Sequence, residues 1–290
     1  MKDLSGKVAV ITGAASGIGR ALALECARKG MRVLLADIEE DPLRKAEQEV
    51  AALAPETLAV KTDVSKADSV AALADAAFDR FGAVHLLCNN AGVAGPGLPI
   101  EALTLRDWEW VLGVNQWGVV HGIMAFLPRM LAGGEPGHIV NTASILGLAT
   151  WANSGPYVAS KFAVVGLSET LARELEGRNV AVSILCPVFV DTSIFESDRN
   201  RPAHLDVERE GPNLRARAQT IGGNWLAPEA VAARVLRGVE AGDFYLFTHP
   251  ETAGMVDERM ERIRAAYPDT TSAIPLAIPP LPGGGRKAQT

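Results

Sequence analysis

Short aliphatic runs alternate with longer helical patterns along almost the whole chain. The runs read VAVIT, RVLLAD, TLAVKTD, HLLCNN, HIVNTAS, VAVSILCP and FYLFT. The intervening patterns predict helices that begin near residues 18 and 42 and that span about 69–81, 104–130, 157–175 and 228–240. Strands that are aliphatic throughout and separated by helices are typical of a parallel sheet buried on both faces. The alternation therefore predicts an α/β fold, with a doubly wound parallel sheet and helices on both of its faces.

The alternation also predicts the domain organisation, because a chain of 290 residues could form one large α/β domain or two small ones. It continues with few breaks, so we expect a single domain over residues 1–266. The polar stretch 191–224 interrupts it and is either a substrate lid or a plain surface insertion; we favour the lid. Residues 267–290 are rich in proline and glycine and predict an extended or disordered tail, whose apolar IPLAIPPLP could instead dock on a neighbouring subunit.

Composition excludes several classes of function. The net charge is −6, and no cluster of lysines and arginines resembles a nucleic-acid-binding stripe. Three cysteines lie in apolar segments and five histidines are scattered, so we expect reduced core thiols in a cytoplasmic protein and no metal site. The sequence has neither a secretion signal nor 18 consecutive apolar residues, so we expect no membrane association. A small-molecule ligand remains.

A glycine-rich loop follows the first aliphatic run. TGAASGIG places Gly13, Gly17 and Gly19 where a strand turns into a helix. Glycines there allow a tight turn and let the backbone approach a pyrophosphate, whose charge the free N–H groups of the helix start favour. Asp37 ends the second strand about 20 residues on, as a ribose-binding acid does in a Rossmann-like fold. The other interpretation is a tight turn followed by an incidental aspartate.

The cofactor that this pattern predicts is NAD. An aspartate at position 37 accepts hydrogen bonds from both hydroxyls of the adenine ribose and repels the additional phosphate of NADP. Neither Ser16 nor Ile38 supplies a cation that would offset this repulsion.

Tyr157 and Lys161 stand four residues apart in SGPYVASKFAV, so that both lie on one face of the predicted helix. The simplest interpretation of this pair alone is a surface tyrosine beside a solvated lysine. A phenol titrates near 10 in water, and a neighbouring ammonium would lower its pKa toward that of a useful acid or base.

The motifs together resemble the short-chain dehydrogenase/reductase family. The resemblance rests on the Gly-x-x-x-Gly-x-Gly spacing, on NNAG at 89–92, on Asn115 and Ser144, and on YVASK at 157–161, and it covers about residues 4–250. It implies a catalytic tetrad. Tyr157 would be the general acid/base, Lys161 would lower its pKa and hold the nicotinamide ribose, Ser144 would hold the substrate oxygen, and Asn115 would hold a water in a proton relay. Without the resemblance, Ser144 would be a serine that caps a turn.

The same resemblance implies the cofactor and substrate residues. The implied cofactor residues are Gly13, Ser16, Gly17, Ile18, Gly19, Asp37, Asp63, Val64, Asn90, Ala91, Gly92, Tyr157, Lys161, Pro187, Val190 and Thr192. The candidate substrate residues are Ser144, Leu146, Trp151, Tyr157, Phe189 and Phe195, together with Val93. Val188 departs from the glycine that the family commonly has after the proline, so the local backbone there is an open question.

The expected activity is hydride transfer between NAD(H) and a secondary alcohol or ketone. The apolar candidate residues favour a hydrophobic or aromatic substrate over a sugar or a carboxylate. GIMAFLPRM, GHIVNTAS and FYLFTHPE resemble members that oxidise benzylic alcohols, so aryl carbinols are one candidate. A non-catalytic nucleotide-binding protein and an isomerase or dehydratase are the alternatives. The resemblance also implies a homodimer or homotetramer.

Overall fold

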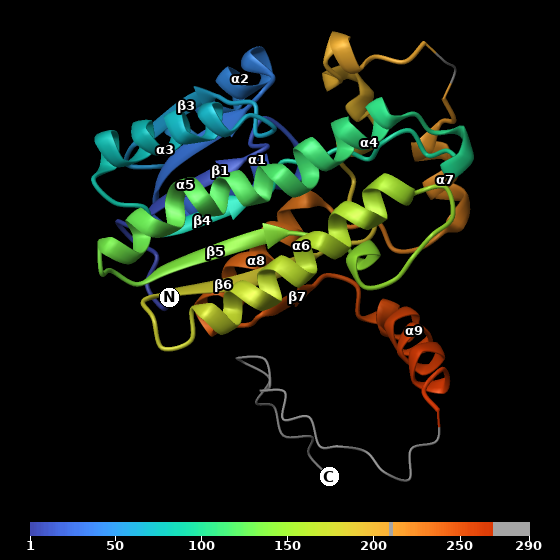
Figure 1. Ribbon diagram of the computed structural model, residues 1–290. Coiled ribbons are helices and arrows are strands. Elements are labelled where there is room, and N and C mark those ends of the chain that lie inside the picture. The colour runs from blue at the N-terminus through green and yellow to red at the C-terminus, as the bar shows by residue number, and fades with distance from the viewer. Residues whose placement is uncertain (209–210, 269–290) are drawn as a thin grey trace.

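The computed structural model describes residues 1–208 and 211–268, which form a layered α/β structure around one parallel sheet (Figure 1). Its strands follow the order β3-β2-β1-β4-β5-β6-β7. The strands are β1 (Val8–Thr12), β2 (Arg32–Asp37), β3 (Thr57–Lys61), β4 (Leu86–Asn89), β5 (Gly137–Thr142), β6 (Val180–Cys186) and β7 (Tyr245–Phe247). The chain builds outward from β1 in both directions, which confirms the predicted doubly wound fold. Ligands of such sheets bind beyond the carboxyl ends of the strands where the order reverses, here between β1 and β4.

Helices cover both faces of the sheet (Figure 1). The first face carries α1 (Gly17–Arg28), α2 (Glu40–Ala51) and α8 (Pro228–Ala241); the second carries α3 (Ala67–Phe81), α5 (Gly118–Ala132) and α6 (Gly155–Glu174). Successive strand residues point to opposite faces. In β1, Ala9 and Ile11 pack against the first layer and Val8 and Val10 against the second, and all four are 0% exposed. Burial on both faces explains why the strands are aliphatic throughout.

The predicted helix over about 104–130 contains a feature that the sequence did not suggest. The structure has α4 (Leu105–Leu112), a π-helical turn η2 (Gly113–Trp117) and then α5. Asn115, which is 0% exposed, lies in the π turn. Such turns are rare and are frequent at functional sites. By length and composition Leu105–Ala132 is also apolar enough to cross a membrane, but this test alone is weak evidence, since core helices of soluble proteins pass it as well.

The polar segment 191–224 is folded in the described residues. It contains η4 (Ser193–Asn200), η5 (Ala203–Leu205) and α7 (Leu214–Ile221). Arg201 holds it by a buried ion pair with Asp107 at 2.8 Å, with side chains that are 6% and 0% exposed. Leu205 is buried against Trp110 and Val111, so an ion pair and apolar packing together fix this segment.

The remaining elements are short or peripheral. They are η1 (Ile100–Ala102), η3 (Ile145–Gly147), η6 (Pro250–Thr252) and α9 (Ala253–Ala265). Almost all of the predicted tail lies outside the described residues, which end at 268.

Candidate active site

The glycine-rich loop between β1 and α1 has no space for side chains. Gly13 and Gly17 have φ values of +67° and +52°, a backbone conformation that residues with a side chain rarely adopt. A Cβ at Gly19 would lie 2.0 Å from the carbonyl oxygen of Gly13, and one at Gly17 would lie 2.9 Å from Cγ2 of Thr192. The loop therefore presents bare backbone at the start of α1, as a pyrophosphate site requires.

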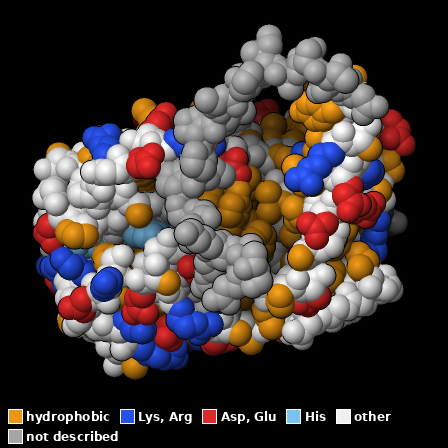
Figure 2. All heavy atoms as spheres, turned by 90° about the horizontal axis from the view of Figure 1, so that it is seen from below, with side chains coloured by type: hydrophobic (Ala, Val, Ile, Leu, Met, Phe, Trp, Pro, Cys, Tyr) orange, Lys and Arg blue, Asp and Glu red, His pale blue; other side chains and the backbone are white. Residues whose placement is uncertain are grey.

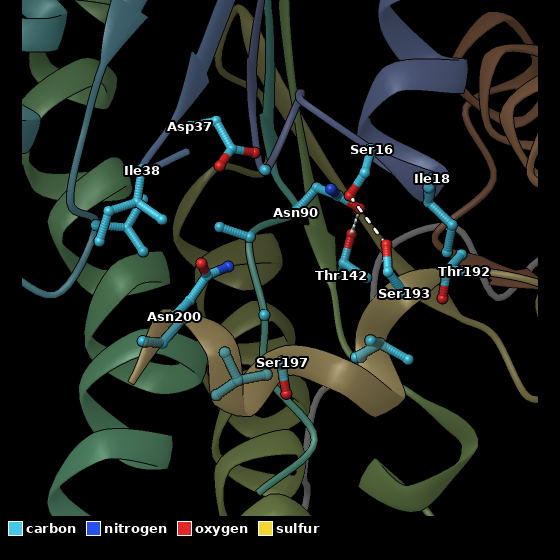
Figure 3. Close-up of a pocket in the computed structure, with 18 of the residues that line it drawn as sticks. Ser16, Ile18, Asp37, Ile38, Asn90, Thr142, Thr192, Ser193, Ser197 and Asn200 are labelled. Carbon is cyan, nitrogen blue, oxygen red and sulfur yellow. Dashed lines mark hydrogen bonds between the residues drawn. The ribbon is translucent and has the colours of Figure 1, made fainter. Parts of the chain in front are cut away.

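A groove runs along the carboxyl ends of the strands beside this loop (Figure 3). The predicted cofactor residues that line it are Gly13, Ser16, Gly17, Ile18, Asp37, Asp63, Val64, Asn90, Ala91, Gly92, Tyr157, Lys161, Pro187 and Thr192. Two predicted cofactor residues do not line it. Gly19 packs beneath the loop against Gly13, and Val190 is buried, forms a parallel bridge with Leu226 and lines a second cavity instead.

Asp37 ends β2 and fixes two backbone segments. Its Oδ2 accepts a hydrogen bond from the N–H of Ala15 at 2.9 Å, and its Oδ1 accepts one from the N–H of Glu39 at 3.0 Å. Burial raises the pKa of Asp37, and the backbone hydrogen bonds lower it in part. The carboxyl group thus faces the groove while holding the glycine loop in place.

Asn90 joins three strands beneath the groove. Its backbone N–H donates to Oγ1 of Thr12 at 2.9 Å, its Nδ2 donates to the carbonyl oxygen of Thr12 at 3.0 Å, and its Oδ1 accepts from Oγ1 of Thr142 at 3.3 Å. It therefore connects the carboxyl ends of β1, β4 and β5. This placement combines a structural role with contact to the groove.

Tyr157 and Lys161 lie near the start of α6, with Nζ of Lys161 5.5 Å from the centre of the Tyr157 ring. Lys161 is 2% exposed, and its Nζ donates to the carbonyl oxygen of Thr142 at 2.8 Å. Burial lowers the pKa of Lys161 to about 8, and burial raises the pKa of Tyr157 whereas a hydrogen bond with Ser144 lowers it. Desolvation outweighs the hydrogen bond, so the pKa of Tyr157 is raised in this structure, opposite to the fall that the resemblance implies.

Ser144 and Asn115 complete the predicted tetrad. Ser144 follows β5 and caps η3 by accepting from the N–H of Leu146 at 3.1 Å, so the turn-capping role holds together with the contact to Tyr157. Asn115 exchanges two hydrogen bonds with the backbone of Val93, at 2.8 and 2.9 Å, and donates to Oγ of Ser160 at 3.2 Å. Its amide is thus held among the elements that carry Tyr157 and Lys161.

A second cavity of about 480 Å³ meets the groove. All the substrate residues of the predicted set line it, namely Ser144, Leu146, Trp151, Tyr157, Phe189 and Phe195. Val93 does not; it lies on the groove side, in a small cluster with Trp110. Tyr157 lines both spaces and therefore lies where they meet.

Aromatic rings form one wall of this cavity. Phe189 stacks on Trp151 and on Trp225, with ring centroids 5.8 and 5.2 Å apart, and Phe195 contacts Trp225 at 5.8 Å. Trp225 does not line the cavity itself but packs against Phe189 and Phe195, and no motif around it marks it in the sequence. Val188 stands where the family commonly has glycine, but its backbone does not need the conformation that favours glycine. Among the described residues, Asn153 alone of the non-glycines has a positive φ, so the φ of Val188 is negative.

Other groove residues were also missed. Glu39, Ser193, Ile194, Ser197, Arg199 and Asn200 line the groove. The last five belong to η4, which we had assigned to a substrate lid. No local sequence signal marks them, because they approach the groove only through the path of the chain after β6.

The groove fits a nicotinamide dinucleotide. The bare glycine backbone suits a pyrophosphate, and Asp37 suits ribose hydroxyls. Tyr157 stands where the groove meets the second cavity, and Lys161 lines the groove one helical turn away. Within the described residues, no group of three or more His, Cys, Asp and Glu side chains could hold a metal ion.

Comparisons with known proteins agree with this geometry. The family model for short chain dehydrogenase matches residues 7–203. A solved short-chain dehydrogenase/reductase from Burkholderia phymatum, in complex with NAD, is 42% identical with a TM-score of 0.87, covering 96% of this chain and 100% of that chain. The CLA biosynthesis dehydrogenase/reductase of Lactiplantibacillus plantarum is 35% identical over 273 residues, 91% of this chain and 95% of the relative. The C alpha-dehydrogenase of Sphingobium sp. is 35% identical over 266 residues, 91% of this chain and 87% of the relative. The chain therefore belongs to the short-chain dehydrogenase/reductase family of oxidoreductases, which bind a nicotinamide cofactor.

Proposed function

We propose that the protein is an NAD-dependent dehydrogenase of hydrophobic or aromatic secondary alcohols, or a reductase of the matching ketones. The observation that carries the proposal is the position of Tyr157, whose side chain lines both the cofactor groove and the apolar cavity. A titratable hydroxyl at this boundary can exchange a proton with a substrate oxygen next to the nicotinamide. Bound nicotinamide supplies or accepts the hydride.

The chain's own residues handle the proton. In our proposal Ser144 donates a hydrogen bond to the substrate oxygen and orients it toward Tyr157, which gives or takes the proton. Lys161 places a positive charge beside the phenol and favours its ionised form. Asn115 holds the backbone of Val93 and Oγ of Ser160 at the π turn, and so positions the elements around the lysine.

The choice of NAD rests on the end of β2. The Asp37 carboxylate faces the groove, and Ile38 beside it is apolar and 37% exposed. A carboxylate accepts hydrogen bonds from ribose hydroxyls and repels a phosphate at the same position. The similarity to a structure solved with NAD supports this choice.

The choice of substrate rests on the cavity. Its walls are mostly aliphatic and aromatic, with Arg217 and Asn153 among the polar residues that line it, and this balance favours a ring-bearing alcohol over a sugar. Aryl carbinols are one candidate, supported by the similarity to a protein named C alpha-dehydrogenase. We also propose that 191–224 is the substrate lid of a single domain over 1–266, since Phe195, Leu214 and Ile221 line the cavity.

The remaining proposals concern partners and location. We propose a homodimer or homotetramer, for which Trp117 and Met124, 51% and 70% exposed on η2 and α5, offer an apolar surface. The cysteines at 26, 88 and 186 are free and buried, as suits a cytoplasmic protein. Figure 2 shows basic and acidic side chains interspersed on one face around a hollow of hydrophobic side chains, which favours small-molecule partners over nucleic acid or membrane.

Steady-state kinetics test the proposal. Aryl and alkyl secondary alcohols, a sugar and a hydroxy acid are compared with NAD and with NADP. We expect the highest kcat/KM for an aryl or alkyl secondary alcohol with NAD. Turnover of none of them, or turnover that survives in Tyr157→Phe, would favour the alternatives of a non-catalytic binding protein or an isomerase.

A further inference from the structure

Segment η4 crosses the cofactor groove and is bonded on both sides of it. At its start, Oγ of Ser193 lies 3.5 Å from Oγ of Ser16 in the glycine loop. In its middle, Oγ of Ser197 accepts from the N–H of Ala94 at 3.0 Å. Figure 3 shows Ser197 and Asn200 across the pocket from Asp37, with Asn200 the nearer of the two to Ile38. The segment therefore spans the groove from the pyrophosphate end to the adenosine end.

Glu39 holds the far end of this segment. Its Oε1 accepts from Nε of Arg199 at 3.0 Å, and its Oε2 accepts from Nη2 of Arg199 at 2.7 Å and from Nδ2 of Asn200 at 3.1 Å. Two parallel N–H···O bonds make this a bidentate pair, which fixes geometry as well as adding energy. The backbone N–H of Glu39 in turn donates to Asp37 at 3.0 Å, so the ribose-binding acid and the clamp on η4 are directly connected.

Arg199 uses four of its five N–H donors in the bonds that the structure describes. Its Nη1 also donates to the carbonyl oxygens of Ser193 and Glu196, at 3.1 and 2.9 Å. The hydrogen bond from Arg199 lowers the pKa of Glu39, and the same bond raises the pKa of Arg199. Among the described residues that line the groove, Arg199 and Lys161 are the cations, and Arg199 is the one beside Asp37 and Ile38.

We propose that Glu39 is a specificity-determining residue of the cofactor site, acting in two ways through Arg199 and Asn200. It clamps η4 over the adenosine end of the groove, and it neutralises the cation that would otherwise receive a phosphate on the adenine ribose. This inference rests on the proposed NAD preference. It extends the basis of that preference from Asp37 to the pair of Glu39 and Arg199, which are 160 positions apart in the chain. It also assigns Ser193–Asn200 to the cofactor site as well as to the substrate lid.

The charges give the physical reason. With Glu39 present, the ribose faces two carboxylates, and the guanidinium is already paired. Without that carboxylate, Arg199 retains its charge and can form bidentate bonds to a phosphate. Removal of the clamp should therefore weaken the binding of a dinucleotide that lacks the phosphate and strengthen the binding of one that carries it.

Fluorescence titration of the purified full chain with NADH and with NADPH tests this directly. In Glu39→Gln we expect the Kd for NADH to rise about five-fold, as an exposed bidentate pair allows. We expect the Kd for NADPH to fall by about the same factor. NADH should also dissociate faster in stopped-flow displacement. Arg199→Met should weaken the binding of both ligands, and the double variant should lose the gain for NADPH.

Two further variants separate this role from a structural one. Asp191→Asn breaks a different ion pair close to η4, with Arg215, outside the groove, and should leave the ratio of the two Kd values unchanged. Glu39→Asp keeps the charge and should retain most of the preference. If Glu39→Gln leaves the ratio of the Kd values for NADH and NADPH unchanged, whether or not both ligands bind more weakly, this inference alone is overturned. Failure of the unmodified protein to bind either ligand would overturn the proposed function as well.

Discussion

Replacement of Lys161 by methionine should stabilise the protein while abolishing turnover. Lys161 is 2% exposed, and the one hydrogen bond that its ammonium group forms among the described residues is to the carbonyl oxygen of Thr142. Methionine has a similar length and carries no charge that must be desolvated. The site therefore keeps a cation at a cost to the folded state, and removal of the cation should make that cost measurable.

The pKa of Lys161 sets the magnitude. Burial lowers it from 10.5 to about 8, which corresponds to about 3 kcal/mol of destabilisation of the charged form in the folded state. The methionine variant also loses the hydrogen bond to Thr142, which offsets about 1 kcal/mol of the gain from removing the buried charge. We expect the free energy of unfolding of Lys161→Met to exceed that of the unmodified protein by about 2 kcal/mol at pH 7.

The sign of the pH dependence is fixed by the same values. Between pH 8 and 10.5 the unfolded chain still binds the proton of Lys161 and the folded chain does not, so this group makes stability rise with pH. The methionine variant lacks this contribution. Its advantage should therefore be constant below pH 8 and decrease by about 1 kcal/mol by pH 9. Comparison of the two proteins cancels Cys26 and Cys88, whose raised pKa values act in the opposite direction at higher pH. Cys186 interacts with Lys161, which lowers the pKa of its thiol, so this thiol does not cancel and the comparison is kept at pH 9 or below.

Urea unfolding at pH 7, 8 and 9 measures these differences, at one protein concentration, with a reductant and without cofactor. Lys45→Met, at an exposed lysine of α2, is the control and should change stability by no more than about 0.5 kcal/mol. A methionine variant that is less stable at pH 7, or an advantage that does not change between pH 8 and 9, would show that burial of the ammonium is not the cost we assign to it.

Four further outcomes are expected. Tyr157→Phe should reduce kcat at least about 100-fold while NADH binding, followed by fluorescence, survives; near-normal turnover would rule out the acid/base role. The unmodified protein should have a higher kcat/KM with NAD(H) than with NADP(H), and Asp37→Ala should reduce the ratio of these two values roughly ten-fold. Equal kcat/KM values of the unmodified protein with the two cofactors would contradict this. Light scattering at micromolar concentration should give a dimer or tetramer, not a monomer. Amide exchange in 191–224 should slow on addition of NAD and a substrate analogue, and an unchanged rate in an active preparation would indicate an inert insertion.

The fold and the polar half of the site could be predicted because their signals are local. Gly13 and Gly17 are required where the backbone turns with positive φ, and Asp37 follows at the end of the next strand. Tyr157 and Lys161 are one helical turn apart, so their proximity depends only on helix geometry. Each of these signals is contained within a few residues, and their order along the chain fixes the topology.

The remainder depended on contacts between distant segments. Glu39 and Arg199 are ordinary charged residues, and their pairing requires the exact path of η4 over the groove. Val190 has the aliphatic character expected of a cofactor contact, but its bridge to Leu226 turns it toward the other cavity. The contacts of Trp225 with Phe189 and Phe195 join segments that are apart in the sequence, so only the folded structure identifies them. Tertiary packing determines the contacts of these residues, and the periodicity of the sequence does not predict such contacts.

The π turn at Asn115 also corrects the rotational phase of a long helix. Val111, Asn115, Val119 and Ile123 recur every four residues, and all are buried. In an uninterrupted α-helix each such step rotates the side chain by about 40°, so the third would lie roughly 120° from the start. The wider turn absorbs much of this rotation, and α4 can face Leu205 of η5 while α5 faces the sheet. Deletion of one residue within Gly113–Trp117 would thus be equivalent to twisting one half of the helix against the other, so that either the cover of the groove or the core of the sheet loses its side chains.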